Sequence, residues 1–438
     1  MNKLPSDIAS NLRSLNLDQC LRDAVDALLR WQVGVETHMD DYWSEQTGWI
    51  KRPSFAWMCG GFPGDWVQGG VNDEGNRAWR FMGVGPIWHT GQAMKALILA
   101  KPIVAAGGDR GYRERIDRAV MQGAAYLLRL QLREGRHRGA FWCPPHSLPP
   151  EWLRQNPSLT VYMMPGKWPR PGDALLNSDM SEAMDGFIMA SDLLKDTAIT
   201  AACRLWGEWL NREANYKPGH YYHWFYADGS VKELIRYWQP DDGVAGLLAV
   251  KFNDADWLKR YQDGVKRCIE WEIDLKEYPA QQARSFYWNA SPMWPVLDGR
   301  VPGDRTHAVK KLEEYTNWLL GLAVPDGMLG FKYAEEKGGI PDQLNTSGDG
   351  AGTMMCARMC YQLWKNTGDR KWAEAVVPTF RWMASAQMRG PEAAGVEGAI
   401  PFCRWMRNPE TGNKFGFKRS ISTSFAIMAM SEWIRELH

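Results

Sequence analysis

The chain has 438 residues, 45% of them hydrophobic, and its 52 basic side chains balance 51 acidic ones to a net charge of +1. A balanced charge leaves no basic footprint for nucleic acid, and no stretch reaches the ~18 uninterrupted apolar residues of a membrane span. The eight cysteines contain no CxxC pair, which argues against a zinc ribbon or a disulfide framework. Because the N-terminus has no apolar signal segment, we expect a cytoplasmic protein. We also expect that it needs no metal or other cofactor.

Apolar residues recur at helical spacing along the chain and predict helices that come in pairs. The first helix is predicted at about 17–33 and the last at about 420–437, and these two are expected to complete one pair. Turn or capping residues separate the members of the other pairs. Those pairs are predicted at about 87–103 with 109–132, 179–195 with 197–214, 241–252 with 254–274, 286–298 with 305–323, and 347–366 with 370–388. No convincing run of alternating strands occurs, and only short extended pieces are expected, for example at 220–230 and 327–333.

The two helices of each pair differ in character. The first member is poor in charge and rich in small residues, as in DGVAGLLAV at 242–250, whereas the second carries charges on one face, as in DADWLKRYQDGVKRC at 254–268. A helix that is apolar all round is typical of complete burial, and an amphipathic one of a surface position. Twelve helices of alternating character predict an all-α fold, an (α/α)6 barrel, formed by one domain over residues 1–438.

Three segments at the ends of second helices resemble one another. They span 28–43, 127–142 and 381–402, and each runs from an apolar helix through a Gln to a glycine and an aromatic turn. The repeat period of 50–70 residues is irregular and longer than that of short helical arrays. The repeat therefore supports hairpins that close into a ring.

The starts of the inner helices are expected to gather at one end of the barrel, where backbone N–H groups and the positive helix dipoles point. Two carboxyls facing each other there could divide the roles of general acid and general base. A first-turn Asp can also simply cap a helix, and Asp179 with Glu182 has the spacing of a capping box. The residues that mark these predicted starts are Asp179, the adjacent pair Asp241 and Asp242, Trp288 with Asn289, and Asp349.

Aromatic residues are abundant in the segments between helices, and the chain contains 24 tryptophans. An indole ring offers a flat apolar face and one N–H donor, which suits the C–H faces and hydroxyls of a sugar ring, although such residues also pack loops onto a core. Arg404 could clamp a carboxylate in bidentate fashion. The candidate substrate-binding residues are Trp88, His89, Tyr222, His223, Trp224, Trp288, Asn289, Arg404 and Trp405.

The whole-chain pattern resembles the six-hairpin (α/α)6-barrel superfamily of glycoside hydrolases and polysaccharide lyases. Within it, NSDMSEAMDGF at 177–187 is similar to the inner-helix Asp segment of the unsaturated-uronyl hydrolases, although the WARGNGW-type segment of part of that branch is absent. The resemblance implies aromatic sugar subsites and an Asp or Glu acid at the start of an inner helix.

A second, local resemblance is to class II terpene cyclases. QPDDGVAGLLAV at 239–250 is similar to their DxDDTA segment, with Gln239 in place of the first Asp, and it implies that Asp241 would be the protonating acid. A non-catalytic toroid that binds a glycan or a protein is a third interpretation.

These observations together favour an enzyme that hydrolyses a glycosidic bond of an oligosaccharide. Asp179 and Asp241 are the predicted acid and base, with Asp242 and Asp349 as further candidates. Elimination beside a uronate carboxyl and terpenoid cyclisation stay open, as do the identity of the sugar and the oligomeric state. We expect a small-molecule or oligosaccharide substrate and no nucleic-acid partner.

Overall fold

A computed structural model describes the chain in segments, and all structural statements below refer to them. They are residues 3–34, 42–44, 48–50, 59–62, 65–71, 77–82, 86–142, 174–213, 220–226, 230–235, 240–270, 293–321, 350–390, 393, 396–407 and 414–438. None of the described helices combines the length and the apolar character needed to cross a membrane.

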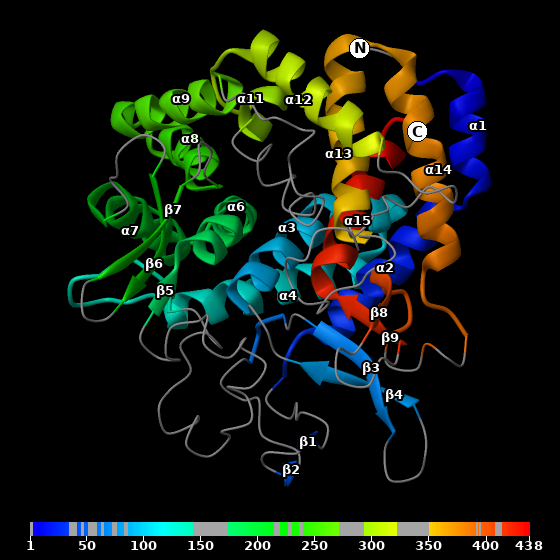
Figure 1. The fold of residues 1–438 in the computed structure, drawn as a ribbon, viewed down its shortest axis with the longest axis horizontal. Helices are drawn as coiled ribbons and strands as arrows, with labels where there is room; N and C mark the ends of the chain where they lie inside the picture. The colour runs from blue at the N-terminus through cyan, green and yellow to red at the C-terminus, as the bar shows by residue number, and fades with distance from the viewer. Residues whose placement is uncertain are drawn as a thin grey trace, which may run out of the picture.

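The described helices form an inner ring enclosed by an outer ring (Figure 1). The inner helices are α3 (Pro86–Val104), α6 (Asn177–Leu194), α8 (Pro240–Phe252), α11 (Trp294–Leu297), α13 (Gly350–Thr367) and α15 (Ser420–Ile434). The outer helices are α2 (Leu17–Trp31), α4 (Arg110–Leu130), α7 (Thr197–Glu213), α9 (Ala255–Glu270), α12 (Arg305–Leu320) and α14 (Arg370–Ala386). Helix α3 packs against α6 and α15, α8 packs against α6 and α11, and α13 packs against α15. The last helix, α15, also packs on α2, so the first and last predicted helices do complete one pair.

Burial follows the predicted difference between the two helix types. Helix α15 is buried at every position from Ile421 to Ile434, and α13 is buried along most of its length. The outer helices bury one face only, and their apolar residues join those of the inner helices in one continuous cluster. An additional helix, α1 (Ser6–Ser14), packs against α14 and was absent from the predicted pattern.

Aspartates start five of the outer helices, as the turn residues predicted. Each carboxylate accepts a hydrogen bond from a backbone N–H of the first turn, at 2.7–3.1 Å, and so satisfies a group that has no partner within the helix. These aspartates are Asp109, Asp196, Asp254, Asp304 and Asp369.

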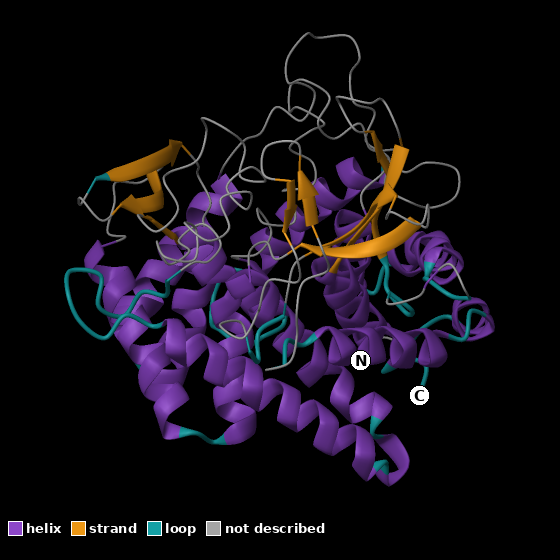
Figure 2. Ribbon diagram, turned by 90° about the horizontal axis from the view of Figure 1, so that it is seen from below, coloured by secondary structure: helices purple, strands orange, loops and turns teal. Residues whose placement is uncertain are grey.

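Three small antiparallel sheets lie at one end of the barrel, which we call the mouth (Figure 2). Their strands are β1 (Tyr42–Ser44), β2 (Gly48–Ile50), β3 (Asp65–Val71), β4 (Arg77–Met82), β5 (Ala174–Leu176), β6 (His220–Tyr226), β7 (Val231–Ile235), β8 (Pro401–Arg407) and β9 (Lys414–Arg419). The strand orders are β1-β2, β4-β3-β9-β8 and β5-β6-β7. The expectation of only short extended pieces was therefore wrong in extent. Strand β6 lies within the expected piece at 220–230, whereas 327–333 lies outside the described residues.

Each of the two larger sheets connects neighbouring inner helices. The four-stranded sheet is built from segments that precede α3 and α15, and the three-stranded sheet from segments that precede α6 and α8. Strands from distant parts of the sequence therefore pair above adjacent helices. This pairing fixes the mouth end of the ring, where the inner helices begin.

The glutamines of the three repeated segments have the same role. Gln32, Gln131 and Gln387 each directly follow an outer helix, and each side-chain amide donates to two backbone carbonyls, one at the turn glycine and one in a neighbouring helix. For Gln131 the acceptors are Gly139, at 3.0 Å, and Ala202 of α7, at 2.9 Å. The amide therefore binds one helical hairpin to the next.

The glycine that each glutamine amide contacts is required by a close approach. Gly139 has a φ of +104°, and a Cβ placed on it would lie 2.3 Å from the carbonyl oxygen of Leu205 in α7. The corresponding glycines, Gly60 and Gly398, also have positive φ and face a carbonyl of the adjacent outer helix. A side chain at this position would push neighbouring hairpins apart.

We expect Gly139→Ala to destabilise the protein by about 1–3 kcal/mol beyond the cost of its backbone conformation, because the added methyl overpacks the contact between hairpins. Gly135→Ala is the matched control, since Gly135 also has positive φ, +74°, but nothing lies within 4 Å of the position that its methyl group would take. Thermal unfolding followed by circular dichroism should show the larger drop in Tm for Gly139→Ala. Equal drops would contradict the close-contact explanation.

Candidate functional site

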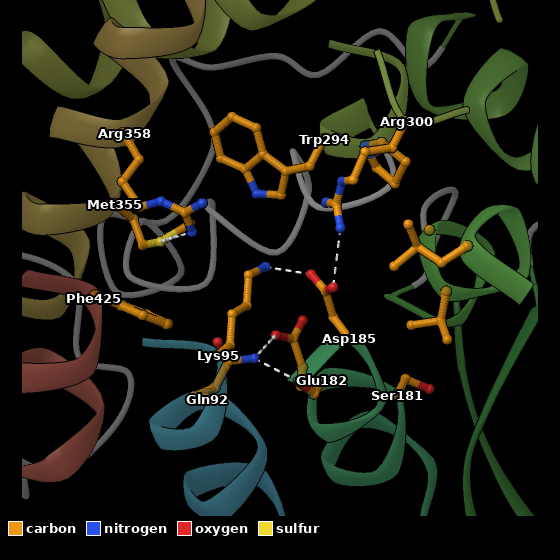
Figure 3. A pocket seen from close by; sticks show the side chains of 14 residues that line it. Gln92, Lys95, Ser181, Glu182, Asp185, Trp294, Arg300, Met355, Arg358 and Phe425 are labelled. Carbon is orange, nitrogen blue, oxygen red and sulfur yellow. Dashed lines mark hydrogen bonds and ion pairs between the residues drawn. The ribbon is translucent and has the colours of Figure 1, made fainter. Parts of the chain in front are cut away.

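A cavity of about 50 Å³ lies on the barrel axis and is large enough for a few water molecules. Its lining comes from the first three turns of the inner helices, including the single turn of α11, and from Arg300 in the segment that follows α11, so the whole inner ring contributes to one layer (Figure 3). The lining residues are Gln92, Lys95, Ser181, Glu182, Asp185, Gly243, Val244, Leu247, Trp294, Pro295, Arg300, Met355, Arg358 and Phe425.

Helix α6 carries three carboxyls at successive three-residue steps, Asp179, Glu182 and Asp185. Residues three apart are neighbours on a helix surface, and six residues correspond to about 9 Å along the axis. Asp179 is in the first turn, nearest the mouth, whereas Glu182 and Asp185 line the cavity beneath it. The stripe therefore leads from the mouth toward the middle of the barrel.

Asp179 is only 9% exposed, and burial raises the pKa of its carboxyl from 3.8 to about 7. Removing an ionised carboxylate from water is costly, so the neutral form is favoured in this position. Near neutral pH, Asp179 therefore exists in both protonation states, which is what a group that donates and then recovers a proton requires.

Glu182 does not form the capping box that its spacing from Asp179 suggested. The Gln92 amide of α3 donates to its Oε2 at 3.2 Å and to its backbone carbonyl at 2.6 Å, so the side chain is directed toward the neighbouring inner helix. Its Oε1 is buried without a hydrogen-bond partner among the described residues. Burial raises the pKa of Glu182 to about 8; the charge of Lys95 opposes this, and those of Asp185 and Asp179 add to it.

Asp185 has the opposite electrostatic environment. Its carboxylate forms an ion pair with Lys95 of α3 and accepts a hydrogen bond from Arg300 Nη1 at 3.2 Å, while Arg300 Nε donates to Asp298 at 2.9 Å. Burial alone would raise the pKa of Asp185, but the charges of Lys95 and Arg300 and their hydrogen bonds outweigh it and hold that pKa far below its ordinary value. Asp185 is thus the ionised carboxyl of the stripe.

Arg358 of α13 closes the far side of the cavity. Its Nε and Nη2 donate to both carboxylate oxygens of Glu432 in α15 at 2.8–3.1 Å. The guanidinium carbon lies 5.4 Å from the centre of the Trp294 ring, within the range of a cation–π contact. Because Arg358 and Glu432 are both largely buried, this pair would be costly to break and joins two neighbouring inner helices.

Of the predicted catalytic residues, Asp179 is described in full. Asp241 and Asp242 lie in the first turn of α8, directly beside α6 in the ring, so the expectation that Asp179 and Asp241 start consecutive inner helices is confirmed. The positions of the Asp241 and Asp242 side chains lie outside the described residues, and so does the whole of Asp349.

Trp88 and His89 lie in the first turn of α3, at the mouth, as predicted. His89 is buried and Trp88 is partly buried, and their ring centres are 4.9 Å apart. Trp288 and Asn289 lie outside the described residues. The predicted helix at 286–298 is described only from Met293, where α11 follows.

The remaining predicted binding residues lie in strands, which was expected as a short extended piece for Tyr222, His223 and Trp224 but not for Arg404 and Trp405. Tyr222, His223 and Trp224 belong to β6, and Trp224 pairs with Leu176, the residue before α6. Arg404 and Trp405 belong to β8 of the other larger sheet.

Both groups coincide with irregularities in strand pairing. The register of β6 shifts between Tyr222 and Trp224, which leaves His223 as an extra residue, and that of β8 shifts between Cys403 and Met406, around Arg404 and Trp405. β-Bulges of this kind are frequent beside active sites. The backbone of both motifs therefore lies at the mouth, above the inner helices.

Sequence reasoning missed the polar lining of the axial cavity, namely Gln92, Lys95, Asp185, Arg300 and Arg358. A signal was present for Lys95 and Arg358, because each is a single charge within an apolar stretch of an inner helix. Such residues are rarely buried unless they are paired. Within the described segments, no group of three or more His, Cys, Asp or Glu side chains is arranged to hold a metal ion.

No protein-family model and no curated protein matches the chain, but solved structures match nearly its whole length. Cellobiose 2-epimerase from Spirochaeta thermophila aligns with a TM-score of 0.57 at 12% identity, over 99% of this chain and 98% of that one. GH family 9 endoglucanase J30 aligns with a TM-score of 0.54 at 13% identity, over 96% of this chain and 85% of that one. The unsaturated glucuronyl hydrolase from Streptococcus agalactiae aligns with a TM-score of 0.53 at 9% identity, over 95% of this chain and 92% of that one. The chain has the (α/α)6-barrel fold of these enzymes.

The predicted fold class and superfamily resemblance are thereby confirmed at the level of the fold. Identities of 9–13% carry no reaction from those proteins to this (α/α)6 barrel.

The raised pKa of Glu182 predicts a pH-dependent gain in stability for Glu182→Gln. Between pH 4.5 and about 8 the folded protein retains a proton that the unfolded chain has released, so wild type loses stability as pH rises through this window. The neutral amide does not titrate, so we expect Tm values close to wild type at pH 5 and a higher Tm for the variant at pH 9. The control, Glu114→Gln, removes an exposed carboxylate of α4, and a similar pH-dependent gain in that control would contradict the assignment.

Proposed function

We propose that this (α/α)6 barrel is a carbohydrate-active enzyme that hydrolyses a glycosidic bond, with Asp179 as its general acid. The observation that carries the proposal is the position of Asp179, a buried carboxyl with a pKa of about 7 in the first turn of an inner helix at the mouth. Glycoside hydrolysis needs a carboxyl that is protonated near neutral pH beside the leaving oxygen.

A second carboxylate must activate water or attack the sugar carbon directly. We assign this role to Asp241, because its helix, α8, is adjacent to α6 and because both residues lie in first turns at the same end of the barrel. In the inverting form, Asp179 gives its proton to the leaving oxygen while Asp241 accepts one from the attacking water, which yields two free hydroxyl ends. The distance between the two carboxyls would distinguish inversion from retention.

The aromatic residues at the mouth provide candidate subsites. Trp88 and His89 start α3, Trp224 pairs beside the start of α6, and Trp405 lies in the bulged strand β8. Aromatic rings interleaved with polar groups suit sugars, which combine apolar faces with hydroxyl edges. The fold is compatible with this function, since the three aligned structures include an endoglucanase, a glucuronyl hydrolase and an epimerase of cellobiose.

Turnover of a panel of neutral and uronate-containing oligosaccharides tests the proposal. Reducing ends and the ultraviolet absorbance of unsaturated uronates are followed together. New reducing ends without a rise in absorbance indicate hydrolysis, whereas a rise in both indicates elimination and would contradict the assigned reaction.

On a substrate found in this way, we expect Asp179→Asn to lower kcat by about 100-fold or more, because the amide cannot donate the proton. Asp256→Asn, in the first turn of outer helix α9 at an exposed position, is the matched control and should keep wild-type turnover. Wild-type kcat in a folded Asp179→Asn variant would overturn the assignment.

The activity should fall as pH rises through about 7. The acid must be protonated in the free enzyme, and the fraction of protonated Asp179 decreases above its pKa of about 7. The pH profile of kcat/KM measures this basic limb. A rate that stays constant to pH 9 would show that Asp179 is not the titrating acid.

A further inference from the structure

The axial cavity has more hydrogen-bond donors than acceptors. An ammonium group offers three N–H donors and a guanidinium five, and neither accepts. Within the described residues, Lys95 donates to Asp185, and Arg300 Nη2 has no acceptor. The acceptors of Arg358 Nη1 in the described part of the chain are the sulfur atoms of Met355 and Met428, which are weak acceptors. The free donors of three cations are therefore available to oxygen atoms entering the cavity.

The arrangement of charge favours an anion in the same place. Asp298 forms an ion pair with Arg300, and Glu432 forms one with Arg358. Neither carboxylate lines the cavity, and each binds the side of its guanidinium group that faces away from the cavity. Asp185 is shared by Lys95 and Arg300, so one lining carboxylate serves two lining cations. Glu182 is largely neutral at neutral pH.

The three cations come from separate parts of the ring but act on one another. Figure 3 shows Lys95, Arg300 and Arg358 around one opening beneath Trp294. Burial is the largest cause that lowers the pKa of Lys95; the charge of Asp185 opposes it, and the charges of Arg358 and Arg300 lower the pKa further. Like charges brought together in a poorly hydrated site repel one another, and a bound anion would relieve this repulsion.

We propose that this cavity binds the carboxylate of an acidic sugar, held by Lys95, Arg300 and Arg358. The proposal rests on the proposed function and narrows its substrate class to uronate-containing glycans. A cavity of about 50 Å³ accommodates a small charged group and not a whole sugar. The carboxylate would enter from the mouth, with the sugar ring above it on the side of Asp179.

The depth of the cavity agrees with this orientation. Asp179 lies six residues before Asp185 on α6, which places it about 9 Å nearer the mouth along the helix axis. A substrate anchored by its carboxylate at the level of Lys95 and Asp185 would therefore extend past Glu182 toward the proposed acid. The cations that select an acidic sugar would then lie deeper in the barrel than the glycosidic bond that reacts.

Calorimetric titration at pH 6 with glucuronate, glucose and inorganic sulfate tests the proposal without turnover. We expect wild type to bind glucuronate at least about 10-fold more tightly than glucose, the order of one charge-assisted hydrogen bond. Lys95→Met and Arg300→Gln should each abolish most of this preference. Arg300 is partly exposed and leaves the Lys95–Asp185 pair intact when substituted, so Arg300→Gln decides the question if Lys95→Met does not fold.

Two control variants isolate the effect. Arg110→Gln removes an equal charge from a side chain that is 88% exposed on α4, and it should retain the preference. Asp179→Asn should also retain it, because it leaves the cavity cations in place. A preference that survives in Asp179→Asn while turnover is lost supports both the cavity site and the proposed acid.

Two results would overturn the inference. The first is equal affinity for glucuronate and glucose in wild type; sulfate binding that depends on Lys95 and Arg300 would in that case identify a site for free anions. The second is a preference that neither Lys95→Met nor Arg300→Gln reduces in folded protein. If glucuronate and glucose bind equally but neutral oligosaccharides are hydrolysed, the cavity proposal fails and the proposed hydrolysis is still supported.

Discussion

Charge buried on the axis of the barrel must be either paired or neutralised, and the interior of this protein is arranged around that requirement. The inner helices bring Asp179, Glu182, Asp185, Lys95 and Arg358 into a region with little water. An isolated ion in such a place would cost far more free energy than one helix contact contributes. Asp185 stays ionised because Lys95 and Arg300 flank it, whereas Asp179 and Glu182 favour their protonated forms. Chemically similar carboxyls on one helix therefore acquire different protonation behaviour from their neighbours.

The same constraint joins the architecture to the candidate chemistry. The Lys95–Asp185 and Arg358–Glu432 pairs each connect two inner helices, so the interactions that neutralise charge also hold the ring together. The outer ring is connected differently, through glutamine amides that bridge a turn and the neighbouring helix. A rigid ring keeps the carboxyl stripe of α6 in register with the cavity. Positioning of this kind is what acid–base chemistry requires of a scaffold.

The mouth combines this rigid base with strands contributed by distant parts of the chain. The two larger sheets connect the segments that precede α3 and α15, and those that precede α6 and α8. Register shifts at His223 and around Arg404 interrupt two of these strands above the inner helices. A fixed barrel that carries different segments at its mouth can serve different substrates.

The sequence by itself determined the helical pairs, the inner and outer character of the helices, the aspartates that start the outer helices, and Asp179 as a residue at the mouth. These features depend on local periodicity and on interactions across a few residues, which a linear reading can detect. The sheets were underestimated, because strand pairs such as β3 with β9 join residues more than 300 positions apart.

The spacing of Glu182 from Asp179 left a capping box as one alternative, but the Gln92 amide of a neighbouring helix determines its orientation. The convergence of Lys95, Arg300 and Arg358 on one cavity was decided only by the tertiary structure. Closing the ring brings together side chains that are far apart in the chain, and the low polarity of the space they share sets which of its carboxyls remain charged.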